Sequence, residues 1–115
     1  MTDTTEIPAE AQESAVIAKL RAAKAAVAGQ EISFELPESK VRVTYPKFRP
    51  FDGWEKAQLQ AGGNAASVNL YYIVAICKFD GERLMAGQYR ELIGDADHLT
   101  ISGKLFNNRD AEGNA

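Results

Sequence analysis

The sequence has one cysteine and one histidine among 115 residues, too few for several kinds of site. Cys77 has no partner for an internal disulfide, which excludes a small secreted domain held together by disulfides. The pair also leaves no set of four ligands for a structural zinc ion. Cys77 lies in an apolar run, where a lone cysteine is typically a small buried hydrophobe. For His98, between Asp97 and Leu99, we expect a charged surface residue.

Long hydrophobic runs are also missing from the sequence. The longest nearly uncharged apolar stretch, residues 68–77, is about half of the roughly 20 residues that a membrane-spanning helix needs. Residues 1–13 are acidic and rich in threonine, without the basic and then apolar order of a signal peptide. We therefore expect a cytoplasmic protein with no membrane partner.

Neither sign of charge dominates the chain, since 13 basic and 16 acidic residues give a net charge of -3. Nucleic-acid-binding proteins normally carry a strongly basic face. The densest basic group here is interrupted by Val, Tyr, Pro and Phe, and consists of Lys40, Arg42, Lys47 and Arg49. Such charges commonly protect the edge of a sheet from aggregation. The charge pattern therefore argues against nucleic acid as the main partner.

No residue pattern indicates catalysis, a cofactor or a metal ion. A hydrolytic site needs a nucleophile, a base and an orienting group, and the single histidine does not supply such a set. The glycines are scattered, and no Lys-Ser or Lys-Thr pair follows a glycine-rich loop as it does in a phosphate-binding loop. The acids Asp80, Glu82, Asp95 and Asp97 do not match a calcium-binding loop, and cap and turn roles explain them better. We predict a protein that is not an enzyme.

The elements that the sequence does contain predict an α+β fold: an N-terminal Ala-rich helix, one β-hairpin, then a bundle of three to four short helices. The N-terminal helix is expected over 9–29, with a thin apolar stripe of Val16, Ile17, Leu20 and Val27. Alternating apolar and polar residues predict strands over 31–36 and 41–45, joined by a polar turn. The apolar face of this hairpin has to pack on the helices that follow.

Four helical segments are predicted after the hairpin. Asp52, with Glu55 three residues later, indicates the start of the first, which ends at Gly62 and Gly63. Asn64 is expected to cap the second, which runs to about Lys78 and forms the centre of the domain because it is apolar on most sides. A short helix over about 86–93, with Tyr89, Leu92 and Ile93 inward, and a helix from Asp95 to Phe106 complete the bundle.

These expectations divide the chain into four segments. Residues 1–8 are expected to be a flexible tail, 9–29 the N-terminal helix, 30–107 the hairpin plus helical domain, and 108–115 a second flexible tail.

The most unusual feature is a group of aromatic residues, interleaved with basic ones, where the hairpin meets the helices. Its members are Tyr45, Lys47, Phe48, Arg49, Phe51 and Trp54. The rings can cover the open face at this junction, which is the interpretation that the composition favours. They can also form a protein interface, where Trp, Tyr and Arg are enriched, or stack on single-stranded nucleic acid.

The order of these elements resembles the tail assembly chaperones of long-tailed bacteriophages and related prophages. The resemblance covers about residues 32–107 and lies in pattern and element order, not in a catalytic signature. It is carried by PKFRP (46–50), WEKAQLQA (54–61), LYYIVAIC (70–77), FDG (79–81), YRELI (89–93) and LTISGKLF (99–106).

The resemblance implies a non-enzymatic assembly factor that works in the bacterial host cytoplasm and is not expected in the mature virion. Its implied partners are the tape-measure protein, which such proteins keep soluble, and tail tube subunits, which they recruit. The N-terminal helix precedes the matched region, so an oligomerisation arm, hence a homo-oligomer, and a temporary cover for a binding groove both remain open. The alternative is a small adaptor or regulatory domain, for which nucleic acid bound through Lys47, Phe48, Arg49 and Trp54 is one candidate ligand.

Overall fold

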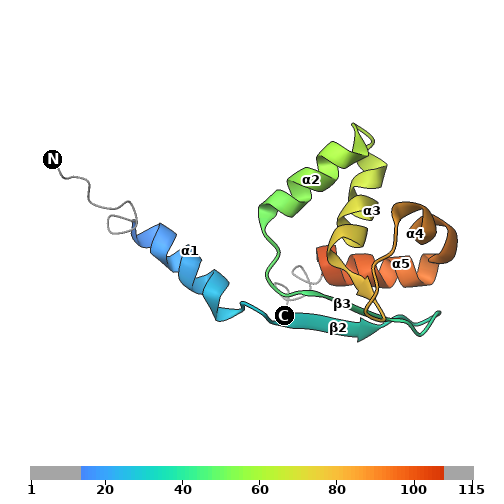
Figure 1. Cartoon of the computed structure of the whole chain (residues 1–115), viewed down its shortest axis with the longest axis horizontal. Coiled ribbons are helices and arrows are strands. Elements are labelled where there is room, and N and C mark those ends of the chain that lie inside the picture. Colours follow the sequence, from blue (N-terminus) through green and yellow to red (C-terminus); the bar gives the residue numbers. More distant parts are fainter. Residues whose placement is uncertain (1–13, 108–115) are drawn as a thin grey trace.

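The computed structural model describes residues 14–107 and confirms the α+β fold (Figure 1). An N-terminal helix leads into an antiparallel hairpin, and short helices follow. The two tails expected at 1–8 and 108–115, and the first residues of the predicted N-terminal helix, lie outside the described residues.

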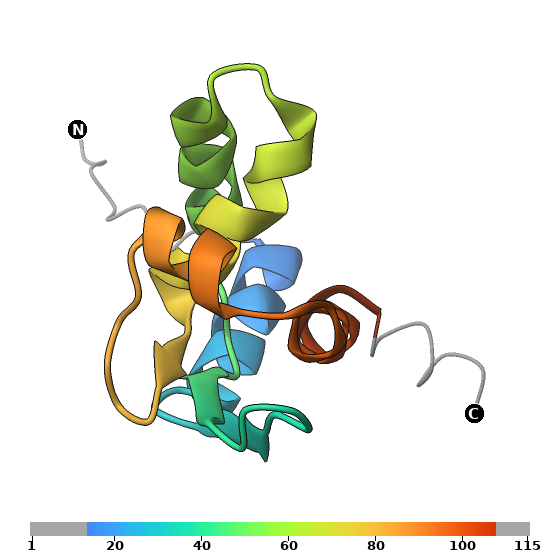
Figure 2. The same cartoon turned by 90° about the vertical axis from the view of Figure 1, so that its right-hand side faces the viewer.

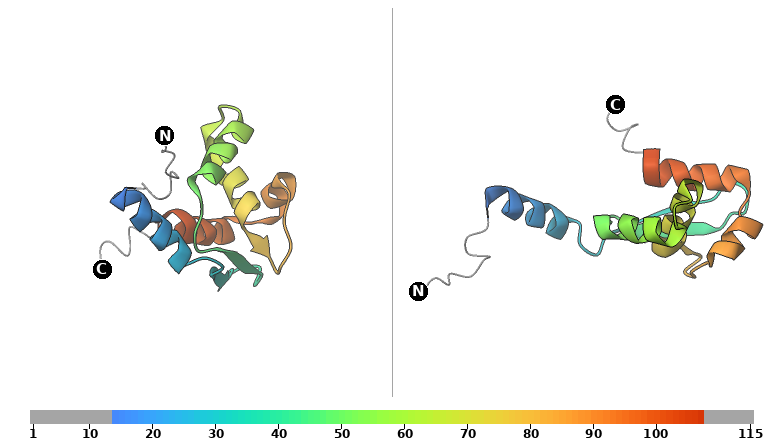
Figure 3. Two further views of the ribbon diagram at one scale, coloured as in Figure 1. Left: turned by 60° about the vertical axis from the view of Figure 1, so that its left-hand side comes forward. Right: turned by 90° about the horizontal axis from the view of Figure 1, so that it is seen from above.

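The N-terminal helix α1 (Ala15–Ala26) begins at Ser14, whose hydroxyl accepts a hydrogen bond from the Ile17 amide at 3.3 Å. None of the residues of α1 is buried. The right-hand view of Figure 3 shows why, because α1 projects away from the rest of the molecule. The expected helix is therefore present, but it contributes nothing to the core.

The hairpin pairs β2 (Glu31–Glu35) with β3 (Arg42–Pro46) as antiparallel strands, with Phe34 opposite Val43. The face toward the helices buries Phe34, Leu36, Val43 and Tyr45, with Ile32 and Val41 partly buried beside them. The opposite face is polar, and there the Arg42 guanidinium and the Thr44 hydroxyl both hydrogen-bond the Ser33 hydroxyl. One face of the sheet therefore forms the floor of the core.

A third strand, β4 (Lys78–Phe79), pairs with β3 and corrects the predicted helix end near Lys78. The helix ends at Ile76, and Cys77 has extended backbone angles. Asp80 fixes the new strand because its amide donates to the Arg42 carbonyl at 2.8 Å and its carboxylate accepts from the Arg42 amide at 2.9 Å. Two extended residues pair with the free edge of β3. The helical spacing of the apolar residues before them gives no sign of this short strand.

Helices α2 (Phe51–Ala61) and α3 (Ala65–Ile76) lie side by side above the sheet (Figure 1). The predicted cap at Asn64 is confirmed, since its side chain accepts from the Ala66 amide at 3.1 Å. The predicted capping box of Asp52 is wrong. Pro50 is the cap residue, so Asp52 falls within the first turn and its carboxylate faces Lys56 at 3.8 Å.

The last elements are α4 (Ala86–Leu92), α5 (Asp95–Ser102) and a π-helical turn η2 (Gly103–Asn107). Figure 2 shows α5 nearly along its axis, to one side of α3 and α4. Tyr89 is buried in the core as expected, and Ile101 and Leu105 are buried there as well. The inward position predicted for Leu92 is wrong, because α4 is only two turns long and turns Tyr89 inward, which leaves Leu92 67% exposed.

Asp97 joins α5 to the hairpin turn over a long distance in the sequence. Asp97 is 1% exposed, and its carboxylate accepts hydrogen bonds from the Glu38 amide at 2.8 Å and the Ser39 amide at 3.0 Å. Burial alone would raise the pKa of Asp97, but these bonds and the nearby Lys40 lower it below the ordinary value. The cap or turn role expected for Asp97 is therefore confirmed in a different place, because its carboxylate caps the amides of the hairpin turn.

His98 is not the fully exposed surface residue that the sequence suggests. It is half-buried on α5, and its Nδ1 lies 2.7 Å from the Tyr89 hydroxyl. Its Nε2 lies 3.4 Å from the Ser102 hydroxyl. The imidazole therefore links α4 to α5 as a structural hydrogen-bonding group.

Candidate protein-binding groove

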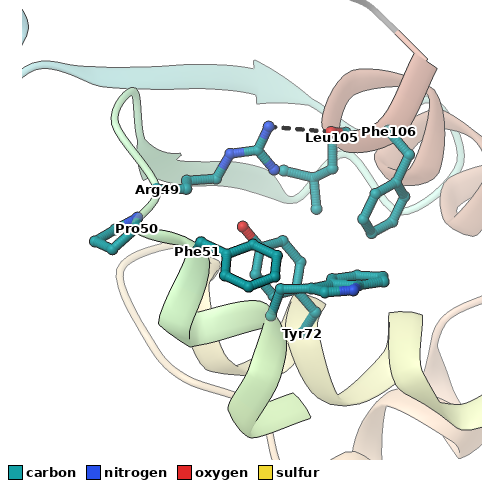
Figure 4. Close-up of a pocket in the computed structure, with 7 residues that line it drawn as sticks. Arg49, Pro50, Phe51, Tyr72, Leu105 and Phe106 are labelled. Atoms are coloured by element: carbon teal, nitrogen blue, oxygen red, sulfur yellow. Dashed lines mark hydrogen bonds between the residues drawn. The ribbon is translucent and has the colours of Figure 1, made fainter. Parts of the chain in front are cut away.

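A groove of about 360 Å³ opens where the loop after β3 and helix α2 meet α3 and η2. Figure 4 shows Arg49 reaching from this loop toward η2, and Phe106 pointing from η2 toward Tyr72. One charged residue and six others line the groove: Arg49, Pro50, Phe51, Trp54, Tyr72, Leu105 and Phe106. We call this feature the aromatic groove.

Three aromatic side chains from three separate elements form its wall. Trp54 packs edge to face against Tyr72, with ring centroids 5.2 Å apart, and against Phe106 at 5.9 Å. Tyr72 and Phe106 lie 6.0 Å apart. Such pairs gain about 0.5–1.5 kcal/mol beyond the area that they bury. The mutual contacts therefore hold the wall in one arrangement.

Arg49 fixes the position of η2 against the loop before α2. Its Nη2 donates to the Leu105 carbonyl at 3.1 Å, and its guanidinium lies 5.4 Å from the centroid of the Tyr45 ring and 5.8 Å from that of Tyr72. Burial raises the pKa of Tyr72 more than the charge of Arg49 and its hydrogen bond lower it. The groove therefore presents a neutral phenol and a cation that is already engaged.

Phe51 forms the exposed rim of the groove. Its side chain is 70% exposed although it lies beside the packed wall. An aromatic ring left in water at the mouth of an apolar groove can be buried by a partner, and buried aromatic anchors dominate protein interfaces.

The structure divides the six residues that the sequence proposed for an interface. Arg49, Phe51 and Trp54 line the aromatic groove. Tyr45 is 2% exposed and belongs to the core. Lys47 is exposed outside the groove, and Phe48 is 37% exposed with the Lys24 ammonium 5.5 Å from its ring centroid.

Sequence reasoning missed the other half of the groove, namely Tyr72, Leu105 and Phe106. These residues are distant from Trp54 in the chain, and helical spacing assigns all three to the core. The tyrosine was the available signal, because a hydroxyl on the most apolar helix commonly marks a side chain with one end near the surface.

The single cysteine lies in the core of the domain. The Cys77 side chain is fully buried, and burial raises the pKa of its thiol to about 12, so the thiolate nucleophile is scarce near neutral pH. Within residues 14–107, no three His, Cys, Asp or Glu side chains are grouped to hold a metal ion. In the same region, no helix is long and apolar enough to cross a membrane.

No family model, curated protein or solved structure matches this chain. The groove, its contacts and its exposed rim therefore carry the functional argument.

Proposed function

We propose that this chain is a non-enzymatic phage tail assembly chaperone that binds the tape-measure protein through the aromatic groove and recruits tail tube subunits. On this proposal it acts in the host cytoplasm and leaves before the virion is complete. The order of hairpin and helices supports the family. The observation that carries the binding function is an apolar groove with a wall of packed aromatic rings and an exposed Phe51 rim.

The size and chemistry of the groove favour a helical segment as its occupant. A volume of about 360 Å³ is near the lower end of ligand pockets and accommodates a few side chains. The lining is mostly aromatic, so apolar side chains projecting from one face of a helix fit it better than a polar ligand does. A long helical tape-measure protein presents such faces repeatedly and would aggregate if they stayed exposed.

The alternative of nucleic-acid binding is less compatible with this geometry. The Arg49 guanidinium donates to a backbone carbonyl and covers two tyrosine rings. The Trp54 ring packs against Tyr72 and Phe106, so it is part of the groove wall. Single-strand binding proteins instead present aromatic faces to successive bases beside cations that follow the backbone.

Co-expression with the tape-measure protein that is encoded beside this chain tests the proposal. We expect the tape-measure protein to be soluble and to co-purify with the native chain. Phe51→Glu should abolish co-purification because it places a charge at the groove rim. Leu59→Glu is the matched control, since Leu59 is on the same helix, is 81% exposed and lies outside the groove lining. A tape-measure protein that is soluble alone, or that binds both variants equally, would contradict the proposal.

A further inference from the structure

Helix α1 presents an unpartnered apolar stripe away from the domain. Val16 is 59% exposed, Leu20 is 61% exposed and Ala23 is also exposed. With Val27 at the end of the helix, these residues recur at intervals of four, three and four, which is the a and d spacing of a coiled-coil seam. Val16, Leu20 and Ala23 lie on one side of a helix with 3.6 residues per turn, and Val27, which is partly buried, is the C-cap residue that follows them.

The charges beside this stripe are all positive. Lys19 and Lys24 occupy the g and e positions that flank Leu20 on either side, and Arg21 is the third charged residue of α1. No acidic residue occurs between Ala15 and Ala26. The stripe is therefore bordered by cations on both sides.

This charge pattern disfavours pairing of α1 with the same helix of a second copy. In a parallel pair, each g position faces the e position of the partner's next heptad, which places Lys19 against Lys24. In an antiparallel pair, Lys19 meets Lys19 and Lys24 meets Lys24. Both arrangements bring like charges together, which destabilises helix pairs.

A membrane surface is also a poor match for α1. Interfacial helices commonly use Trp, Phe and several Leu on a broad apolar face. The described part of α1 has no aromatic residue, and its three largest apolar side chains are Val16, Ile17 and Leu20. Such a narrow stripe suits the seam of a helix pair better than the boundary of a bilayer.

We infer that α1 is a docking helix for a partner protein that presents an acidic amphipathic helix, with apolar a and d positions and Asp or Glu at e and g. This inference goes beyond the proposed function, because it concerns a surface separate from the aromatic groove and does not depend on the identity of the groove's occupant. The partner helix covers Val16 and Leu20, and its carboxylates meet Lys19 and Lys24.

An NMR titration of the isotope-labelled full chain tests this inference. The probe is a three-heptad helical peptide with Leu at a and d and Glu at e and g, and its matched control has Lys at e and g. The Glu peptide should shift the amide signals of α1, with weak affinity because the seam spans about two heptads. The Lys peptide should leave those signals unchanged.

Variants of the chain separate specific docking from general attraction. Lys19→Glu with Lys24→Glu should weaken binding of the Glu peptide about tenfold, since two attractive contacts become repulsive. The same variant should gain binding to the Lys peptide. The control Lys56→Glu with Lys78→Glu changes the net charge equally at exposed positions outside α1 and should bind as the native chain does. Leu20→Ser should also lose binding, which a purely electrostatic contact would retain.

Several outcomes would overturn the inference. These are equal affinity for the two peptides, shifts located outside α1, or full binding by Leu20→Ser. Two further results assign α1 to another occupant: binding of anionic vesicles but not of the Glu peptide, or self-association that Leu20→Ser abolishes. Misfolding does not confuse these results, because α1 has no buried residues and the core signals report on the domain independently.

Discussion

Replacing Asp97 by alanine should destabilise the fold, and by more than replacing Asp95, the other acidic residue of α5. The carboxylate is almost completely buried and accepts two backbone hydrogen bonds, from the amides of Glu38 and Ser39, at 2.8 and 3.0 Å. A hydrogen bond to a charged group contributes about 1.5–3 kcal/mol. Glu38 and Ser39 lie in an exposed turn, so water can partly replace the lost acceptor. We therefore expect the free energy of unfolding to fall by about 1.5 kcal/mol for each of the two hydrogen bonds, about 3 kcal/mol in all.

The pH dependence of this loss has a definite sign. The pKa of Asp97 is lowered in the folded protein, so its contribution to stability is fully present above the ordinary value of 3.8. The contribution is lost as the pH falls below that value and through the folded pKa. The difference in unfolding free energy between the native chain and Asp97→Ala should therefore be constant from pH 5 to 7 and shrink at about pH 3.

Urea unfolding provides the assay, with the fluorescence of the single tryptophan, Trp54, as the signal. Asp95→Ala is the matched control, since Asp95 is exposed in the same helical turn and contributes through the helix dipole, about 0.5 kcal/mol. If Asp97→Ala and Asp95→Ala unfold at the same urea concentration at pH 7, the role assigned to Asp97 is refuted.

Three further predictions concern the groove and the core. Arg49→Leu should lower the free energy of unfolding by about 1–2 kcal/mol in urea, because the Leu105 carbonyl loses its donor; an unchanged midpoint would contradict this. Cys77 should react with a thiol reagent at pH 8 only as fast as the protein opens, since its side chain is fully buried and burial raises its pKa to about 12; rapid labelling of the folded chain would disprove it. Phe51→Glu and Leu59→Glu should keep the native unfolding midpoint, because both side chains are exposed; a large loss for either would show that it packs in the fold.

The sequence predicts those parts of the fold that depend on local patterns. Period-two alternation gives the two strands of the hairpin and their buried face, and the Asn64 cap follows from the local chemistry of a helix start. The start of α2 was misplaced because the pattern of Asp52 and Glu55 resembles a capping box. The helix begins earlier, after Pro50.

The features that were not predicted depend on contacts between distant residues. β4 exists because two residues after α3 complete the edge of β3. Asp97 and Glu38 are 59 positions apart, so no local pattern connects them. Only part of the candidate site was predicted, for the same reason. The sequence placed Arg49, Phe51 and Trp54 together, but Phe106 reaches the groove only when η2 packs beside α2 and α3.

Hydrogen–deuterium exchange of the purified complex with the tape-measure protein tests the central claim most directly, since it maps where the partner lies. We predict that binding protects the amides of Arg49 and of residues 51–54, together with those of Leu105 and Phe106. The polar face of the sheet should exchange as in the free chain. Protection confined to the sheet edge at β2, with the aromatic groove unchanged, would contradict the account.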